Sequence, residues 1–69
     1  MNMIPVVSDN VREVGYEART HMLRVRFRSG GLYDYYGVNV ALYEQFMFPH
    51  PWRRVGRLVK GHGFRRVAA

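Results

Sequence analysis

A run of alternating apolar and basic residues near the middle of the chain restricts the fold more than any other feature. In residues 21–28, Leu23, Val25 and Phe27 fall on one side of an extended backbone, and every residue between and after them is arginine. Such period-two alternation is typical of a β-strand with one face in solvent. Ser29-Gly30-Gly31 follows and tolerates the positive φ angles of a tight hairpin. The pattern predicts an antiparallel hairpin.

Two further segments fit beside this strand. Residues 11–18 and 32–36 both alternate with period two, and Asp34 and Tyr36 fall on the face opposite to the other two tyrosines of the return segment. The residues that share the inner face of the two segments are Val14, Tyr16, Ala18, Tyr33 and Tyr35. We therefore expect a three-stranded antiparallel meander, after an irregular lead-in over residues 1–9.

The periodicity then changes to that of helices. Asn39 is a good N-cap for a helix over Val40–Phe48, and a second helix over Pro51–Lys60 can begin with proline in its first turn. Gly61-His62-Gly63 ends the second helix, and Phe64–Val67 is a candidate terminal strand. The expected fold is α+β: a small antiparallel sheet of three to four strands, in the order β-β-β-α-α with an optional final β, and two short helices packed on one face.

The 69 residues without cysteine fit one small domain that has no disulfide or thiolate zinc site to stabilise it. We assign residues 1–69 to this domain, with a core over about 7–67 and flexible ends at 1–6 and 68–69. The predicted core residues are Val14, Tyr16, Leu23, Val25, Phe27, Tyr33, Tyr35, Val38, Tyr43, Phe46, Val55 and Val59. No segment has the composition of a secretory signal or the length of a membrane span, so we expect a soluble, cytoplasmic protein.

The basic charge is concentrated near the carboxyl end. After Glu44 there is no acidic residue, and six of the eleven lysines and arginines lie in this stretch. They are Arg53, Arg54, Arg57, Lys60, Arg65 and Arg66. On a helix, Arg53, Arg57 and Lys60 share a face. A field of one sign beside Trp52 and Phe64 indicates a polyanionic partner, although a solvated surface that only maintains solubility has the same composition.

A second set of candidate residues lies on the outer face of the predicted sheet. The spacing between successive arginines of the set Arg24, Arg26 and Arg28 is about 6.8 Å, near the distance between phosphates in an extended single strand of nucleic acid. Tyr36 could stack a base. Alternatively, these arginines protect a sheet edge from aggregation, or pair with acids such as Asp34 across the ladder.

Protein–protein interaction is the alternative function. Phe46, Met47 and Phe48 form a run that no helix can bury on one side, which suggests a surface for a homodimer or another partner. Alternatively, a small core wraps both sides of this helix. A partner with an acidic face would explain the positive charge as well as nucleic acid does. Trp52 could belong to that surface or to the core.

Catalysis and metal binding have little support in the sequence. His21, His50 and His62 lack the spacing of metal ligands, and Ser29 is explained by the turn. We predict no enzymatic activity, no metal and no cofactor.

Several of these landmarks together resemble the KTSC domain family. The strongest part is Ser29-Gly30, Tyr33, Tyr35 and Gly37-Val38, and the likeness covers about Val7 to Val67. The family often has a Ser-x-Gly turn before its second helix, where this chain has His50-Pro51-Trp52.

The family takes its name from the carboxyl end of some lysyl-tRNA synthetases and also occurs as stand-alone proteins of bacteria and phages. The resemblance implies RNA binding and no enzymatic activity. Combined with the basic segment, it predicts a small non-catalytic module that binds RNA or other single-stranded nucleic acid with low sequence specificity.

Overall fold

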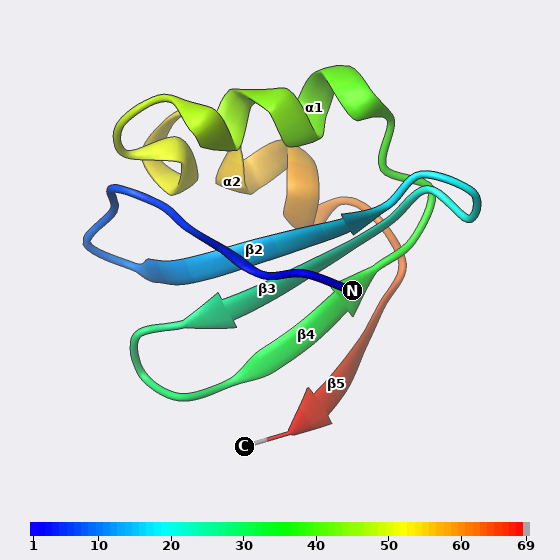
Figure 1. Cartoon of the computed structure of the whole chain (residues 1–69), viewed down its shortest axis with the longest axis horizontal. Coiled ribbons are helices and arrows are strands. Elements are labelled where there is room, and N and C mark those ends of the chain that lie inside the picture. Colours follow the sequence, from blue (N-terminus) through cyan, green and yellow to red (C-terminus); the bar gives the residue numbers. More distant parts are fainter. Residues whose placement is uncertain (69) are drawn as a thin grey trace.

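The protein is built on a five-stranded antiparallel sheet in which the strands lie side by side in chain order. The computed structural model describes residues 1–68. The strands are β1 (Ile4–Pro5), β2 (Val11–Glu17), β3 (Met22–Phe27), β4 (Leu32–Tyr35) and β5 (Phe64–Ala68). Both helices lie on the same side of this sheet (Figure 1). The α+β class and the central meander are thus confirmed.

The turn between β3 and β4 forms where the glycines predicted it. The amide of Phe27 donates to the carbonyl of Gly31 over 2.8 Å, and the amide of Gly30 donates back to Phe27 over 2.9 Å. Gly30 has a φ of 110°, a backbone conformation that side chains disfavour. This turn sets the register that places Val25 opposite Tyr33 and Leu23 opposite Tyr35.

The sheet has five strands instead of the predicted three to four, because the first residues of the chain form the additional strand β1. Ile4 pairs with Val14 and Pro5 with Glu13, within a segment expected to be an irregular and flexible lead-in. Two residues that include a proline carry no alternation to detect. Gly15 provides the contact surface for this end of the chain, because a β-carbon there would lie 2.8 Å from the side chains of Met1 and Met3. The terminal strand, β5, is present.

The helical part has three short elements: α1 (Val40–Glu44), the 3₁₀ turn η1 (Gln45–Met47) and α2 (Pro51–Lys60). Asn39 caps α1 as predicted, its side chain accepting a hydrogen bond from the amide of Leu42 over 2.9 Å. The helix expected over Val40–Phe48 tightens into η1 after Glu44. Pro51 opens α2, whose bounds agree with the prediction.

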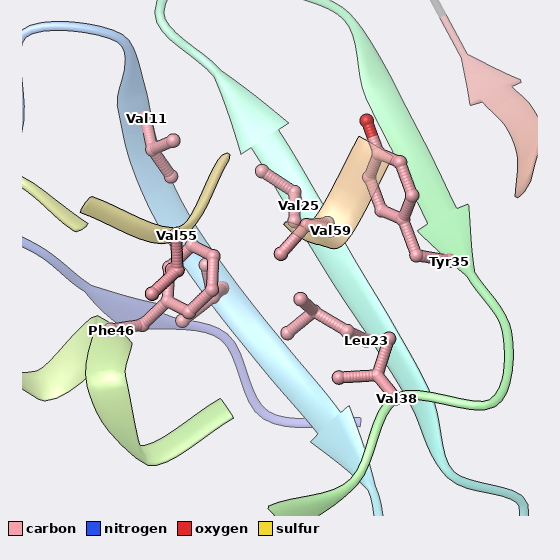
Figure 2. Close-up of a cluster of buried hydrophobic side chains, with 9 residues drawn as sticks. Val11, Leu23, Val25, Tyr35, Val38, Phe46, Val55 and Val59 are labelled. Carbon is pink, nitrogen blue, oxygen red and sulfur yellow. The ribbon is translucent and has the colours of Figure 1, made fainter. Parts of the chain in front are cut away.

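The core lies between the sheet and α2 (Figure 2). Its fully or nearly fully buried side chains are Val11, Val14, Leu23, Val25, Tyr35, Val38, Phe46, Val55 and Val59. The sequence prediction missed Val11. Four aromatic residues expected in the core pack at its margin instead and are only partly buried: Tyr16, Phe27, Tyr33 and Tyr43. The margin formed by Phe27 and Tyr33 adjoins the candidate site.

Candidate functional site

An open groove lies between α2 and the β4–β5 side of the sheet, with a volume of about 470 Å³. Seven residues line it: Phe27, Ser29, Tyr33, Tyr35, Trp52, Lys60 and Phe64. We call it the aromatic groove, because five of the seven carry aromatic rings. Its residues come from β3, the following turn, β4, α2 and β5, so it exists only in the folded chain.

The pairing of β4 with β5 brings one wall of the aromatic groove together. Tyr35 faces Phe64 and Tyr33 faces Arg66 across the ladder. Paired residues of antiparallel strands project to the same side of the sheet, so all four side chains lie on the helix side. Phe64 remains 59% exposed, because β5 is an edge strand at the side of the sheet away from α1 (Figure 1).

The opposite wall comes from one flank of α2. Trp52, Gly56 and Lys60 follow one another at intervals of four residues and therefore share that flank. The indole of Trp52 lies against Gly56, where a β-carbon would be only 2.9 Å from the ring. Glycine at this helical position thus allows the tryptophan to lie flat along the helix. Trp52 is partly buried, and so acts both as core margin and as groove wall.

The rings contact one another in a continuous series. The centroids of Phe27 and Trp52 are 4.9 Å apart in an edge-to-face arrangement, and Tyr35 lies 6.3 Å from Trp52 and 5.9 Å from Phe64. Separations of 4.5–7 Å are those at which aromatic pairs attract. The rings therefore support one another, and they line the groove on both of its walls.

Arg24 and Arg65, two of the predicted nucleic-acid contacts, are engaged with an acid instead. On the sheet face away from the helices, Arg24 makes two hydrogen bonds to the carboxylate of Asp34, of 2.7 and 2.9 Å, and Arg65 makes one of 3.3 Å. Asp34 is fully buried beneath them. Their bonds hold the pKa of Asp34 below its ordinary value, Arg24 contributing most, and the same carboxylate raises the pKa of Arg24.

Four more of the predicted basic residues bind groups of the protein itself. Arg26 donates to the carbonyl of Gly30 and lies 3.8 Å from the carboxylate of Glu13, while Arg28 donates to the carbonyl of Ser8. Arg53 pairs with Asp9. Arg54 donates to the side chain and carbonyl of Gln45 and to the carbonyls of Phe48 and Pro49, so it joins α2 to the segment around η1.

Of the predicted basic contacts, three remain without an acid or hydrogen-bond partner in residues 1–68: Arg57, Lys60 and Arg66. Lys60 lines the aromatic groove. The guanidinium carbon of Arg66 lies 5.9 Å from the centroid of Tyr33, within the range of a cation–π contact. Arg57 is exposed on α2, three residues before Lys60. The free positive charge near the groove thus comes from both of its walls.

Comparison with known proteins places this arrangement in a family. The sequence model of the KTSC domain matches residues 7–49, more than half of the chain. The chain belongs to the KTSC domain family. It is also similar to the crystal structure of a KTSC domain protein from Yersinia pestis, with a TM-score of 0.86 and 29% identity over 97% of each chain. No curated protein matches the sequence.

These two matches differ in extent. The match to the family's sequence model ends at residue 49, just before the segment His50-Pro51-Trp52. The likeness to the Yersinia pestis structure continues over nearly the whole chain, and so includes most of α2 and β5. In this KTSC domain the fold of the groove is therefore shared with a relative, while the residues after 49 that line it lie outside the matched sequence pattern.

The remaining candidates of the KTSC domain do not form one surface. Tyr36 is exposed and lines a second hollow with Glu17, Arg19, Thr20 and Met22. Of the predicted protein-interaction residues, Phe46 is buried in the core, whereas Met47 and Phe48 are exposed. Trp52 lines the aromatic groove and also packs against Phe46 of η1.

Neither a cluster of metal ligands nor a membrane-spanning helix was found among the described residues. Within residues 1–68, no three histidine or acidic side chains gather closely enough to hold an ion. No helix in the same range is long and apolar enough to cross a membrane. His62 places its Nδ1 3.0 Å from the carbonyl of Tyr36, in the loop that leads to β5.

Most residues of the groove were singled out by the sequence, but two of them, Phe27 and Tyr33, were placed in the core instead of at its margin. Phe27, Tyr33 and Tyr35 were expected in the core, and only Tyr35 is nearly fully buried. The missing signal was the pairing of β5 with β4, since it sets Phe64 and Arg66 beside those rings. Large aromatics at alternate positions of β4, followed by an aromatic and a basic residue in a terminal strand, were the available indication.

Proposed function

We propose that this KTSC domain is a non-catalytic module that binds nucleic acid through the aromatic groove and the basic residues beside it. The observation that carries the proposal is the position of the free cations. Arg57, Lys60 and Arg66 are the predicted basic contacts without an acid or hydrogen-bond partner in residues 1–68, and Lys60 and Arg66 lie at aromatic surfaces. Cations bind the phosphates of a nucleic acid, and aromatic rings stack with its bases.

The proposal narrows the set of contacts. Arg24, Arg65, Arg26, Arg28 and Arg54 are held by the protein's own acids and carbonyls. Their release for phosphate binding would leave those groups unsatisfied, at a cost of about 1–3 kcal/mol each where buried. Arg57, Lys60 and Arg66 are available without that cost.

A salt titration tests the proposal. Fluorescein-labelled single-stranded RNA, single-stranded DNA and duplex DNA are titrated with the protein at low and physiological salt, and binding is measured by anisotropy. Three phosphate contacts on a single strand give a slope of log K against log salt of about −2. Lys60→Ala and Arg66→Ala each reduce that slope by about 0.7. Arg12→Ala, an exposed arginine on β2, is the matched control and leaves the slope unchanged.

A second candidate function is the binding of a protein with an acidic surface. It is favoured by exposed Phe48, whose ring lies 5.9 Å from the guanidinium of Arg54, and by exposed Met47 beside it. Absence of binding to every oligonucleotide at low salt contradicts the first proposal. Stoichiometric capture of one protein from nuclease-treated lysate, lost in Phe48→Ala, then supports the second.

A further inference from the structure

We infer that the aromatic groove takes a single unpaired base, stacked on the exposed ring of Phe64, while Lys60 and Arg66 bind the phosphates on either side of that nucleotide. The inference rests on the proposed function and specifies its ligand: single-stranded rather than duplex nucleic acid, bound by base stacking as well as by charge.

The walls of the groove have the chemistry of a stacking site. Phe64 is 59% exposed although its ring packs 5.9 Å from both Tyr33 and Tyr35. The ring of Phe64 thus packs against two tyrosines and still exposes apolar surface to water. A base stacked there would cover surface that the fold leaves unburied.

The size of the groove fits a ligand of one or two rings. Its volume of about 470 Å³ lies in the lower part of the range of about 300–1,000 Å³ found for small-molecule sites. In a duplex the base faces are covered by neighbouring bases, and unstacking one costs a few kcal/mol. The aromatic groove is therefore accessible mainly to unpaired nucleotides.

The charges around the groove suit a phosphate backbone that crosses it. Lys60 stands on α2 and Arg66 on β5, so one cation comes from each wall. No acidic residue lines the groove among the described residues. Asp34, the acid nearest in strand register, lies on the other face of the sheet, where two arginines bind its carboxylate. Besides Lys60, the polar side-chain groups in the lining are few: the hydroxyls of Ser29 and of the two tyrosines, and the indole N–H of Trp52. The site is therefore expected to accept several bases.

The experiment compares two ligands of equal charge. An oligothymidylate of about eight nucleotides and an abasic oligonucleotide of the same length are titrated into the full-length protein at low salt. Anisotropy measures affinity, and the emission of Trp52, the one tryptophan of the chain, reports on the groove. Stacking predicts that the abasic strand binds about tenfold more weakly and that only the base-bearing strand quenches Trp52.

Two variants make the result specific. Phe64→Ala is expected to lower the affinity for oligothymidylate about tenfold and to leave the affinity for the abasic strand unchanged. Leu58→Ala, an exposed apolar residue elsewhere on α2, is the matched control and should alter neither. Circular dichroism confirms folding, and if Phe64→Ala unfolds, Phe64→Leu retains the apolar contact while it removes the aromatic face.

The outcomes separate this inference from the proposed function. Equal affinity for the two strands, with retained salt dependence, overturns the inference and leaves nucleic-acid binding by charge intact. Absence of binding to either strand overturns both. Tighter binding of a duplex than of the single strand also contradicts the inference.

Discussion

The negative charge of Asp34 is paired with positive charges of the protein itself. Its carboxylate is fully buried and accepts bonds from Arg24 and Arg65, which lie on the two neighbouring strands. One carboxylate thus joins β3, β4 and β5 on the face that no helix covers. The removal of one member of a buried pair leaves the other charge without its partner.

Asp34→Asn is therefore expected to lower the free energy of unfolding by about 2 kcal/mol, the contribution of hydrogen bonds to charged groups. Urea unfolding measures the change. Glu13→Gln is the control, because the pair of Glu13 with Arg26 is partly exposed and 3.8 Å long; it should cost less than about 1 kcal/mol. Equal effects of the two substitutions would show that Asp34 has no special role.

The same carboxylate makes stability depend on acid pH. Arg24, and then Arg65, lower the pKa of Asp34 in the folded protein, whereas in the unfolded chain it is about 3.9. The unfolded state thus binds the proton first, and the stabilisation is fully present above this value. It is lost progressively as the pH falls below 3.9 through the folded pKa. We expect Asp34→Asn to show a flatter decline of stability below about pH 4, measured by urea unfolding at several pH values; an unchanged profile would contradict this.

At the scale of secondary structure, α2 combines three roles on different sides. Val55 and Val59 are buried in the core, Trp52 and Gly56 form a groove wall, and Arg54 holds the segment around η1. A glycine inside a helix normally costs about 1 kcal/mol relative to alanine. Its presence at position 56 follows from the indole that lies against it.

Gly56→Ala tests this explanation. The added methyl would lie 2.9 Å from the indole of Trp52, and overpacking of about 1–3 kcal/mol outweighs the gain in helix propensity. We expect a net loss of about 1 kcal/mol and a shift in Trp52 emission as the ring moves. Gly63→Ala is the control, since nothing lies within 4 Å of a β-carbon there. A more stable Gly56→Ala protein with unchanged emission would show that the ring has room.

Two arginines of α2 should separate stability from binding. Arg54 donates to Gln45, Phe48 and Pro49, so Arg54→Ala is expected to cost about 1 kcal/mol of stability with little effect on oligonucleotide affinity. Arg57 is exposed and has no partner in residues 1–68, so Arg57→Ala should change stability by less than about 0.5 kcal/mol and weaken binding. Thermal unfolding measures the stability of the two variants, and anisotropy measures their affinity for oligonucleotides. A loss of affinity in Arg54→Ala together with a loss of stability in Arg57→Ala would contradict these roles.

The elements with strong periodicity were predictable and those fixed by tertiary contact were not. The alternation around Val25, the glycines after β3 and the proline of α2 correctly predicted β3, its turn and the second helix. β1 depends on packing of the first residues against Gly15, and no local pattern encodes that. The burial of Asp34 and the exposure of Phe64 both follow from the pairing of β4 with β5, a contact between segments about thirty residues apart in sequence.

At the scale of the whole molecule, a net charge of +6 is held within principal dimensions of 27 × 26 × 23 Å. At about 0.01 M salt the screening length of about 30 Å exceeds these dimensions, whereas at about 0.15 M it is about 8 Å. Repulsion among unpaired cations should therefore destabilise the protein at low salt.

We expect the melting temperature to rise by a few degrees from the lower to the higher of those two salt concentrations. A change of 1 kcal/mol in the free energy of unfolding corresponds to about 4–8 °C in a domain of this size. Differential scanning calorimetry measures the shift. The double variant Lys60→Ala/Arg66→Ala lacks two cations and should show a smaller rise. A melting temperature that falls with salt would instead show that exposed ion pairs such as Arg53 with Asp9 dominate.

The two edges of the sheet are protected against self-association by different means. β1 is two residues long and contains Pro5, which offers no amide to a further strand. β5 has five residues and an open edge, and the charged residues that discourage another strand from adding there are Arg65 and Arg66. Arg66 is also a proposed ligand contact. Variation at this position to tune affinity would thus remove a barrier to aggregation, so solubility and binding cannot evolve independently at Arg66.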